Sequence, residues 1–477
     1  MRTIAACVLT VALTATTLPA TELWIGATST SITPDKPVAL DGHRNLRISN
    51  KVESPITATA LALESREGDK VLDQAIMVSC DLVAIRPGIL KAVRDKVKPR
   101  LADFPIDKLF LAATHTHHAP VTVEGRYTLP AEGNMKPAEY VAFFSTAVAD
   151  AVVESWQKRR VGKVGWGHGQ AVVAQNRRAV YADGTAAMYG ATNTPKFRGI
   201  EGYEDHNLDV LFFWDQQDRL IATAINVPCP SQDAEGGLAI HADFWHPVRE
   251  TLRKLHGKDL CVLGLAGAGG DQTSRPMYRK AAEERMRKLR GLTRLEEVAR
   301  RIVQGWEDAY EGACKDIRSD VVLRHSVRQI ELPHRKVTDA EVAEARKAAA
   351  QYANDPAQRW NYRWHQGVVE RYEAQHAGTE GPFGMELHVL RLGDVAIATN
   401  EFELFTDYGV QIKARSPAVQ TLIIQLTGSG GYLPTPRAVS GGGYSAVIQS
   451  SRVGPEGGQV LVDRSVEEIK ALWPESK

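Results

Sequence analysis

The stretch LFLAATHTHHAP, residues 109–120, joins a short apolar run to three histidines in four positions. Residues 109–113 are apolar throughout, which is typical of a strand that is buried on both faces. Polar side chains that follow such a strand in an α/β fold lie at the sheet edge, where ligand sites form. Imidazole is a common metal ligand and the usual proton carrier near neutral pH. We therefore expect a functional site at His115, His117 and His118, against the alternative of a loop held by imidazole hydrogen bonds.

Four further apolar runs end in the same way, each in a polar cluster. Residues 221–227 lead to Cys229, residues 260–265 to the loop 266–274, residues 395–398 to Glu403, and residues 422–426 to a glycine-rich turn before Tyr432. Charged segments with helical patterning lie between the runs, the longest at residues 280–309 and 339–374. The pattern predicts a single large α/β domain with a central mixed β-sheet and flanking helices, and a pocket at the strand ends.

Composition and charge narrow the classes of function. The chain has 477 residues, of which 43% are hydrophobic, so it can bury a substantial core. The formal net charge is +1, and nothing in this balance favours nucleic acid or an anionic membrane as a partner.

The first twenty residues have the pattern of a signal peptide. Arg2 supplies the positive charge, residues 4–16 are apolar and small, and Ala20 suits cleavage. The apolar run is too short to cross a bilayer comfortably, and a buried N-terminal element is the alternative. We therefore expect residues 1–20 to be removed and residues 21–477 to be exported, to a periplasm or beyond, with no transmembrane segment after cleavage.

The polar clusters carry side chains suited to chemistry. Cys229 stands between two prolines, and its thiolate could bind zinc, although a buried small hydrophobe is an equal alternative. The loop 266–274 is rich in glycine, and its N–H groups could face an oxyanion, with Thr273 or Ser274 as a nucleophile. It lacks the lysine of a phosphate-binding loop, and a tight turn capped by Asp271 is the alternative.

Oxygen ligands and basic side chains complete the candidates. Glu403, with Glu401 as a weaker alternative, and Tyr432 follow the last two apolar runs. Arg177 and Arg178 could bind a carboxylate or a similar anion, or form an exposed basic pair. The aromatic cluster that includes Trp360 and Trp364 could line a substrate cleft or pack a helix onto the core.

The order of these motifs resembles the catalytic domain of neutral, non-lysosomal ceramidases, which are secreted zinc amidases that hydrolyse the N-acyl bond of ceramide. The matching segments span residues 22–449 and are THTHHAP (114–120), CPS (229–231), HADF (241–244), GDQTSRP (270–276), Glu403 six residues before Gly409, and GYLPT (431–435). The likeness is to the catalytic domain, without the C-terminal β-domain of the family.

The resemblance implies a ligand set and catalytic roles. One zinc ion per chain would be held by His115, Cys229, Glu403 and Tyr432. His117 would orient water or substrate beside the metal, and His117 or Asp271 would pass a proton to the leaving amine. The hydroxyl of Thr273 or Ser274 would bind or attack the amide. From the glycine-rich loop itself we expect Gly269 and Gly270 to bind substrate through their backbone N–H groups.

Two departures from the family pattern leave alternatives open. The family has histidine where this chain has Cys229, and His241 is a possible substitute ligand. The hydroxyl loop has one extra residue, so either Thr273 or Ser274 could take the place of the family serine. The favoured hypothesis is that the protein is an exported, zinc-dependent hydrolase of ceramide or a related lipid amide. The alternatives keep the fold and act on a polar or carbohydrate-derived substrate, or bind a ligand without catalysis.

Overall fold

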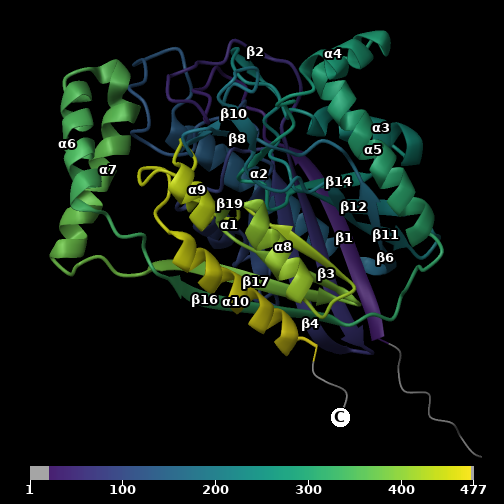
Figure 1. Ribbon diagram of the computed structural model, residues 1–477. Coiled ribbons are helices and arrows are strands. Elements are labelled where there is room, and N and C mark those ends of the chain that lie inside the picture. Colours follow the sequence, from purple (N-terminus) through teal and green to yellow (C-terminus); the bar gives the residue numbers. More distant parts are fainter. Residues whose placement is uncertain (1–20, 474–477) are drawn as a thin grey trace, which may run out of the picture.

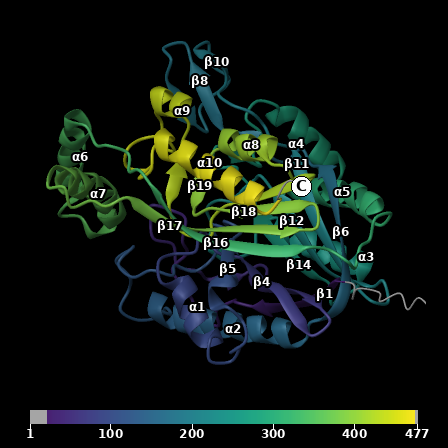
Figure 2. The ribbon, with the colours of Figure 1, turned by 90° about the horizontal axis from the view of Figure 1, so that it is seen from below.

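Two β-sheets lie face to face at the centre of the computed structural model, and helices cover their outer faces. The structure describes residues 21–473, so the predicted signal peptide lies outside the described residues. Figure 2 shows the resulting four layers, with α1 (Ile89–Val97) and α2 (Pro137–Gln157) on one outer face and α8 (Thr406–Arg415) and α10 (Pro455–Ala471) on the other.

The larger sheet has eight strands in the order β14-β12-β11-β6-β1-β3-β4-β5. Their bounds are β1 Thr21–Ser31, β3 Thr57–Glu67, β4 Lys70–Cys80, β5 Leu109–Ala113, β6 Arg160–Gln170, β11 Asn207–Asp215, β12 Leu220–Val227 and β14 Cys261–Ala266. The pairs β12–β14 and β4–β5 are parallel, and the other pairs are antiparallel. The predicted mixed sheet is therefore confirmed.

A smaller sheet of four strands packs against the first, in the order β16-β17-β18-β20. The strands are β16 Leu323–Leu332, β17 Phe383–Leu392, β18 Val395–Thr399 and β20 Gln420–Ile424, and β18 and β20 are parallel. The second sheet was not foreseen, because its strands carry the same apolar pattern as those of the first.

Alternation along the strands explains how both faces of the larger sheet are covered. In β3 the side chains of Leu61 and Leu63 face the smaller sheet, together with Phe110 of β5. The intervening Ala60 and Ala62 face α1 and α2. Because both faces are dry, the strand is apolar at nearly every position, which is the pattern of a fully covered sheet.

Further helices lie at the ends and sides of the sheets (Figure 1). They are α3 Trp245–His256, α4 Lys280–Leu289, α5 Arg294–Ala313, α6 Asp339–Tyr352, α7 Arg359–His376 and α9 Pro436–Gly441, with 3-10 turns at Ile106–Lys108 and Pro356–Gln358. Each predicted helical segment is thus two helices. The first breaks at Gly291, whose φ is +67°, and the second breaks at Pro356. Among residues 21–473 no helix is long and apolar enough to cross a membrane.

Short strands surround the strand ends. They are β2 Lys51–Val52 with β13 Ala239–Ile240, β7 Gln175–Asn176 with β15 Gln272–Thr273, β8 Arg178–Tyr181 with β9 Ala186–Met188 and β10 Phe197–Ile200, and β19 Phe402–Leu404 with β21 Gly431–Leu433. All five apolar runs predicted as strands are strands. However, β5, β12 and β14 belong to the larger sheet, whereas β18 and β20 belong to the smaller one.

Hydrogen bonds bring the ends of the two sheets together. The Ala113 N–H at the end of β5 donates to the Leu426 carbonyl beyond β20, at 3.1 Å. The Gln425 N–H donates to the Ala266 carbonyl at the end of β14, at 2.9 Å. Consequently the loops that follow β5, β14 and β20 start from neighbouring points, although they come from different sheets.

Candidate active site

The turn after β5 is fixed by its backbone. His115 has a φ of +76°, a left-handed conformation that is uncommon for residues other than glycine. Its N–H donates to the Leu82 carbonyl, and the Thr114 N–H donates to the Cys80 carbonyl. Residues held in sparsely populated conformations cluster at functional sites. The turn sends His115 and His117 into one pocket, whereas His118 does not line it.

The two pocket histidines face each other through their Nε2 atoms, which are 3.2 Å apart. His115 Nδ1 lies 2.8 Å from the Val83 carbonyl oxygen and donates to it, so its Nε2 carries the lone pair. His117 Nδ1 lies 3.4 Å from Gln232 Nε2. Burial lowers the pKa of His115 and, more strongly, that of His117. Both imidazoles are therefore neutral near pH 7, which is the form that can accept a proton.

A carboxylate and a phenol complete the same side of the pocket. The parallel pairing of β19 with β21 sets Glu403 opposite Tyr432. Glu403 Oε2 is 3.6 Å from His115 Nε2. Burial, and next the charge of Glu403, raise the pKa of Tyr432 well above its usual value, so this hydroxyl keeps its proton. Of the residues predicted for the site, His115, His117, Glu403 and Tyr432 are brought together.

Arg177 lies behind this group as a fully buried guanidinium. Its Nη2 donates to the Tyr432 hydroxyl at 3.2 Å and to the Gly270 carbonyl at 2.8 Å. The same Nη2 is 3.8 Å from Glu403 Oε2, and Nη1 donates to Tyr189 at 3.1 Å. Burial opposes the charge, but Tyr189, Tyr432 and Glu403 raise the pKa of Arg177 overall. Arg177 therefore holds a fixed positive charge beside the phenol and the carboxylate.

The pocket has a volume of about 530 Å³. Around the histidines, Glu403 and Tyr432, its lining includes His43, Arg44, Arg86, Arg126, Tyr189, Gln232, Glu235 and Tyr444. Trp360 and Trp364 line it from α7, which agrees with a cleft position for part of the predicted aromatic cluster. The wall is rich in basic and aromatic groups.

Cys229 and His241, the two candidates for one zinc ligand, do not line the pocket. Cys229 Sγ is 3.6 Å from the Pro230 carbonyl oxygen and 3.9 Å from that of Val173, inside an apolar cluster. Burial raises the pKa of this thiol, so the thiol stays protonated. In that form cysteine behaves as a small hydrophobic residue. His241 stacks on His118, with ring centroids 3.7 Å apart.

The glycine-rich loop 266–274 packs against the backbone of the segment that carries Glu403. The Gly269 N–H donates to Gln425 at 3.4 Å, and the Gly270 N–H donates to the Leu404 carbonyl at 2.8 Å. A Cβ atom at Gly270 would lie 2.2 Å from the Glu403 carbonyl oxygen, so only glycine allows this approach. These N–H groups are used inside the protein, and neither glycine lines the pocket.

The acid and hydroxyls of the same loop are also buried. Asp271 accepts hydrogen bonds from Thr406 N–H and Oγ1 and from Asn176 Nδ2, which fasten three segments together. Thr273 Oγ1 accepts from Tyr189, a pocket residue, at 3.2 Å. Ser274 Oγ is buried and has no hydrogen-bond partner within residues 21–473. The loop therefore reaches the pocket through Tyr189.

Arg177 and Arg178 are adjacent in the sequence but have different surroundings. Arg178 turns away from the pocket and pairs with Glu201 at 2.6 Å. It also donates to the carbonyls of Ala438 and Gly442 and so holds α9. Both arginines are fully buried, so the alternative of an exposed basic pair is wrong.

Several pocket residues were missed at the level of sequence. Gln232 follows Cys229 by three residues on the same strand-end loop, so the strand-end rule could have found it. Arg44 and Arg86 lie in loops that do not follow one of the five runs, whereas Arg126 lies far along the loop after residues 109–113. No local pattern marks any of these three arginines. Tyr444 follows the last motif and carries no signal of its own.

The predicted zinc site can be tested against these positions. In residues 21–473 no group of three or more His, Cys, Asp or Glu side chains is arranged to hold a metal ion. His115, Glu403 and Tyr432 lie together, but Cys229 is turned away and the Tyr432 oxygen accepts from Arg177. The ligand set that the resemblance implied does not fit zinc as a set.

The chain resembles known proteins in its fold and not in its sequence. No protein-family model and no curated protein matches the sequence. A solved structure described as neutral ceramidase from Pseudomonas aeruginosa matches with a TM-score of 0.68 at 14% identity, covering 94% of this chain and 75% of that one. A structure described as ceramidase complexed with C2 matches with a TM-score of 0.67 at 13% identity, covering 95% and 75%. The chain therefore adopts the neutral ceramidase fold, as the order of its motifs predicted.

Proposed function

We propose that the protein is a hydrolase that cleaves an N-acyl amide in the pocket at the strand ends. The observation that carries the proposal is the convergence of two neutral imidazoles, His115 and His117, with Glu403 and Tyr432. Such a set provides proton acceptors and a proton-bearing donor within one cavity. The neutral ceramidase fold supports the same reaction class, although fold alone does not assign a substrate.

In the proposed reaction a water molecule attacks the acyl carbon. The imidazole pair accepts the proton of that water as the new carbon–oxygen bond forms. The carbon–nitrogen bond then breaks, and the proton returns to the leaving amine. The products are a carboxylic acid and an amine, so no oxidant or further reactant is required. Neutral imidazole is the form that this step needs, and burial favours that form.

Tyr432 and Arg177 are suited to the negative charge that develops on the acyl oxygen. The Tyr432 hydroxyl is protonated, and Arg177 donates to it from a fixed position. Preorganised donors in a water-poor site stabilise an oxyanion more strongly than donors in water. In this arrangement Glu403 keeps Arg177 and His115 in place, since it lies 3.8 Å from one and 3.6 Å from the other.

One feature of the proposal rests on sequence. Export rests on the leader-like pattern of residues 1–20, and the mature N-terminus would test it. A zinc ion is not part of the proposal, because the ligand set that the resemblance implied does not lie together, and metal analysis of the purified protein would test this. The roles given above to His115, His117, Tyr432 and Arg177 do not depend on zinc.

Neighbouring histidines allow a matched experiment. We would measure release of free amine from a panel of N-acyl amides that includes short-chain N-acyl sphingosines, N-acyl amino acids and N-acetylated sugars. His117→Gln should lower kcat by about 10²-fold or more, the range of a lost general base. His118→Gln changes the same kind of side chain one residue away and outside the pocket, so its kcat should stay near wild type. Equal activity of wild type and His117→Gln, with both folded, would reject the proposed site.

A further inference from the structure

We propose that the substrate of this pocket carries a carboxylate, which Arg44, Arg86 and Arg126 recognise at the pocket wall. The inference rests on the proposed function for turnover, but it concerns binding and can be measured without turnover. A carboxylate-bearing substrate is a different class from the neutral lipid ceramide that the fold resemblance suggests.

Arg44 is the first observation behind the inference. Its guanidinium carbon lies over three aromatic rings, at 5.0 Å from the centroid of Trp360, 4.7 Å from Trp364 and 4.9 Å from Tyr444. Within residues 21–473 its side chain forms no ion pair and no hydrogen bond to another residue. The rings fix the planar group at the pocket while its N–H donors stay available. A guanidinium held in this way is suited to two parallel bonds with a carboxylate.

Arg86 and Arg126 are the second observation, because they share one carboxylate. Asp41 accepts from Arg86 Nη2 at 3.0 Å, and its other oxygen is 2.6 Å from Arg126 Nε. Burial of Asp41 opposes its charge, but Arg126 and Arg86 lower its pKa to about 2 overall, so it is ionised near pH 7. One negative charge thus faces two positive charges at the wall.

The balance of charge around the pocket is positive. Two acidic residues line it: Glu235 pairs with Arg275 at 2.9 Å, and Glu403 lies near Arg177. We count the charged residues that line the pocket together with their direct ion-pair partners. There are five arginines (Arg44, Arg86, Arg126, Arg177 and Arg275) and three acids (Asp41, Glu235 and Glu403). The pocket histidines add no charge when neutral. An anionic ligand would balance this excess, whereas a neutral lipid would cover charged groups without pairing them.

The shape and lining of the pocket support the same conclusion. The cavity of about 530 Å³ has Val83 and Met188 as its aliphatic members, and the rest of its wall is polar, charged, aromatic or glycine. A long acyl chain requires a continuous apolar lining to bury its methylene groups, whereas here the aromatic rings alternate with arginines, histidines and carboxylates. A compact, polar molecule with one carboxylate matches this wall better.

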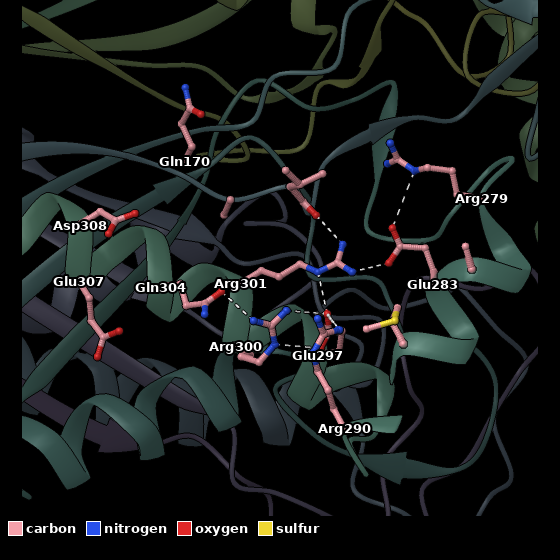
Figure 3. A pocket seen from close by; sticks show the side chains of 14 residues that line it. Gln170, Arg279, Glu283, Arg290, Glu297, Arg300, Arg301, Gln304, Glu307 and Asp308 are labelled. Carbon is pink, nitrogen blue, oxygen red and sulfur yellow. Dashed lines mark hydrogen bonds and ion pairs between the residues drawn. The ribbon is translucent and has the colours of Figure 1, made fainter. Parts of the chain in front are cut away.

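A larger hollow among the described residues does not offer such a site. Figure 3 shows the groove of about 770 Å³ between α4 and α5, in which arginines and acids point at one another. Glu297 accepts from Arg300 and Arg301, and Glu283 accepts from Arg301. Because these charges are matched within the protein, the groove leaves no excess for an anion.

Pairs of small molecules that differ only in charge test the inference. We would measure binding of N-hexanoylglycine against N-hexanoylglycinamide, and of glucuronic acid against glucuronamide, by calorimetry at low and high salt. The acid of at least one pair should bind about tenfold more tightly than its amide at low salt, as expected for a charge-assisted bond. The ratio should fall toward one in Arg44→Gln. Arg464 is an exposed residue of α10 that pairs with Glu467. Arg464→Gln removes an equal charge away from the pocket, so the ratio of acid to amide affinity should stay as in the wild type.

The outcomes separate the two proposals. Tight binding of an acid without release of amine from any N-acyl compound would support the substrate class and reject the hydrolase. Cleavage of N-acyl amides with no preference for an acid would support the hydrolase and reject the substrate class. Preference for short-chain N-acyl sphingosine, equal binding within both pairs, or no binding by any of these compounds would also overturn the carboxylate inference.

Discussion

The strand-end pocket and the α4–α5 groove are both rich in charge, yet their charges are arranged differently. In the groove, Glu297 interacts with Arg290, Arg300 and Arg301, and Glu283 lies beside Arg279 and Arg301. No His, Cys, Ser, Thr or Tyr lines that groove, although it is the larger hollow. In the pocket, neutral imidazoles face a carboxylate, and Arg44 has no carboxylate partner within residues 21–473. Chemistry is expected in the hollow whose groups are left unmatched, not in the larger of the two.

The origin of the charges explains this difference. Arg300 and Arg301 follow Glu297 by three and four residues on one helix, so they meet it by helical geometry alone. In the pocket, His115 and His117 come from the loop after β5, whereas Glu403 and Tyr432 come from the short strands β19 and β21. Backbone contacts between distant segments fix these positions. The pairs of Glu297 with Arg300 and Arg301 are set by the geometry of one helix, whereas the pocket depends on segments that are far apart in the sequence.

Arg177→Met should have the largest effect. The variant leaves Glu403 without its buried cation and removes the donors to Tyr432, Tyr189 and Gly270. Breaking a buried pair in this way costs about 3–5 kcal/mol of unfolding free energy. Denaturant unfolding would measure the loss, and amide hydrolysis should fall below detection.

The groove supplies the control for this variant. Arg300→Met removes one of three arginines around Glu297 from a partly exposed position, so its cost should stay within about 1 kcal/mol with activity intact. Similar losses in the two variants would contradict the contrast between the pocket and the groove.

Glu403→Gln should reduce activity more than stability. The amide keeps the shape of the carboxylate but removes the charge beside His115 and Arg177. We expect kcat to fall by about 10²–10⁴-fold, the range for a disturbed acid–base group, with the protein still folded. Steady-state kinetics and thermal unfolding would measure the two effects. Glu297→Gln should give the reverse pattern, a loss of stability with kcat unchanged, and a fall in its kcat would link the groove to catalysis.

Much of the fold could be predicted because it depends on local pattern. The run 109–113 is strand β5, and the other four runs are strands with polar residues at their ends. Ligand sites in α/β folds form where strands end, and this rule predicted one shared pocket. The structure places His115, His117, Glu403 and Tyr432 in that pocket. The division into two sheets has no such local signal, because the strands of both are buried and apolar alike.

The direction of each side chain in the loops could not be predicted. Cys229 and Gln232 share one loop, yet Cys229 faces an apolar cluster and Gln232 faces His117. Arg177 and Arg178 are adjacent, and only Arg177 contacts the pocket group. Such choices depend on turns like the one at His115, whose positive φ is imposed by contacts with a distant loop. Neither a resemblance nor a motif contains that information.

Cys229→Ala tests the placement of the thiol directly. Because Cys229 Sγ lies in the apolar cluster, the variant should lose about 1 kcal/mol of unfolding free energy through lost packing. Its zinc content, measured by elemental analysis of protein purified without chelator, should equal that of the wild type. Zinc that is present in the wild type and absent from Cys229→Ala would show that the thiol is a ligand and would contradict its position here.

A pH dependence of stability is expected at Glu297, on the groove side of the comparison. Hydrogen bonds from Arg300 lower the pKa of Glu297, and those from Arg301 add to this against the effect of burial, to about 2 overall from the usual 4.5. A carboxylate whose pKa is lowered by folding stabilises the protein above its unfolded pKa, and this contribution is lost as pH falls through the folded value. The difference in unfolding free energy between wild type and Glu297→Gln should therefore be constant above about pH 5 and shrink steadily toward pH 2. Unfolding curves of both proteins across this range would measure it. A difference that does not change with pH would mean that the matched charges of the groove contribute packing alone, and the electrostatic contrast with the pocket would then rest on the pocket residues only.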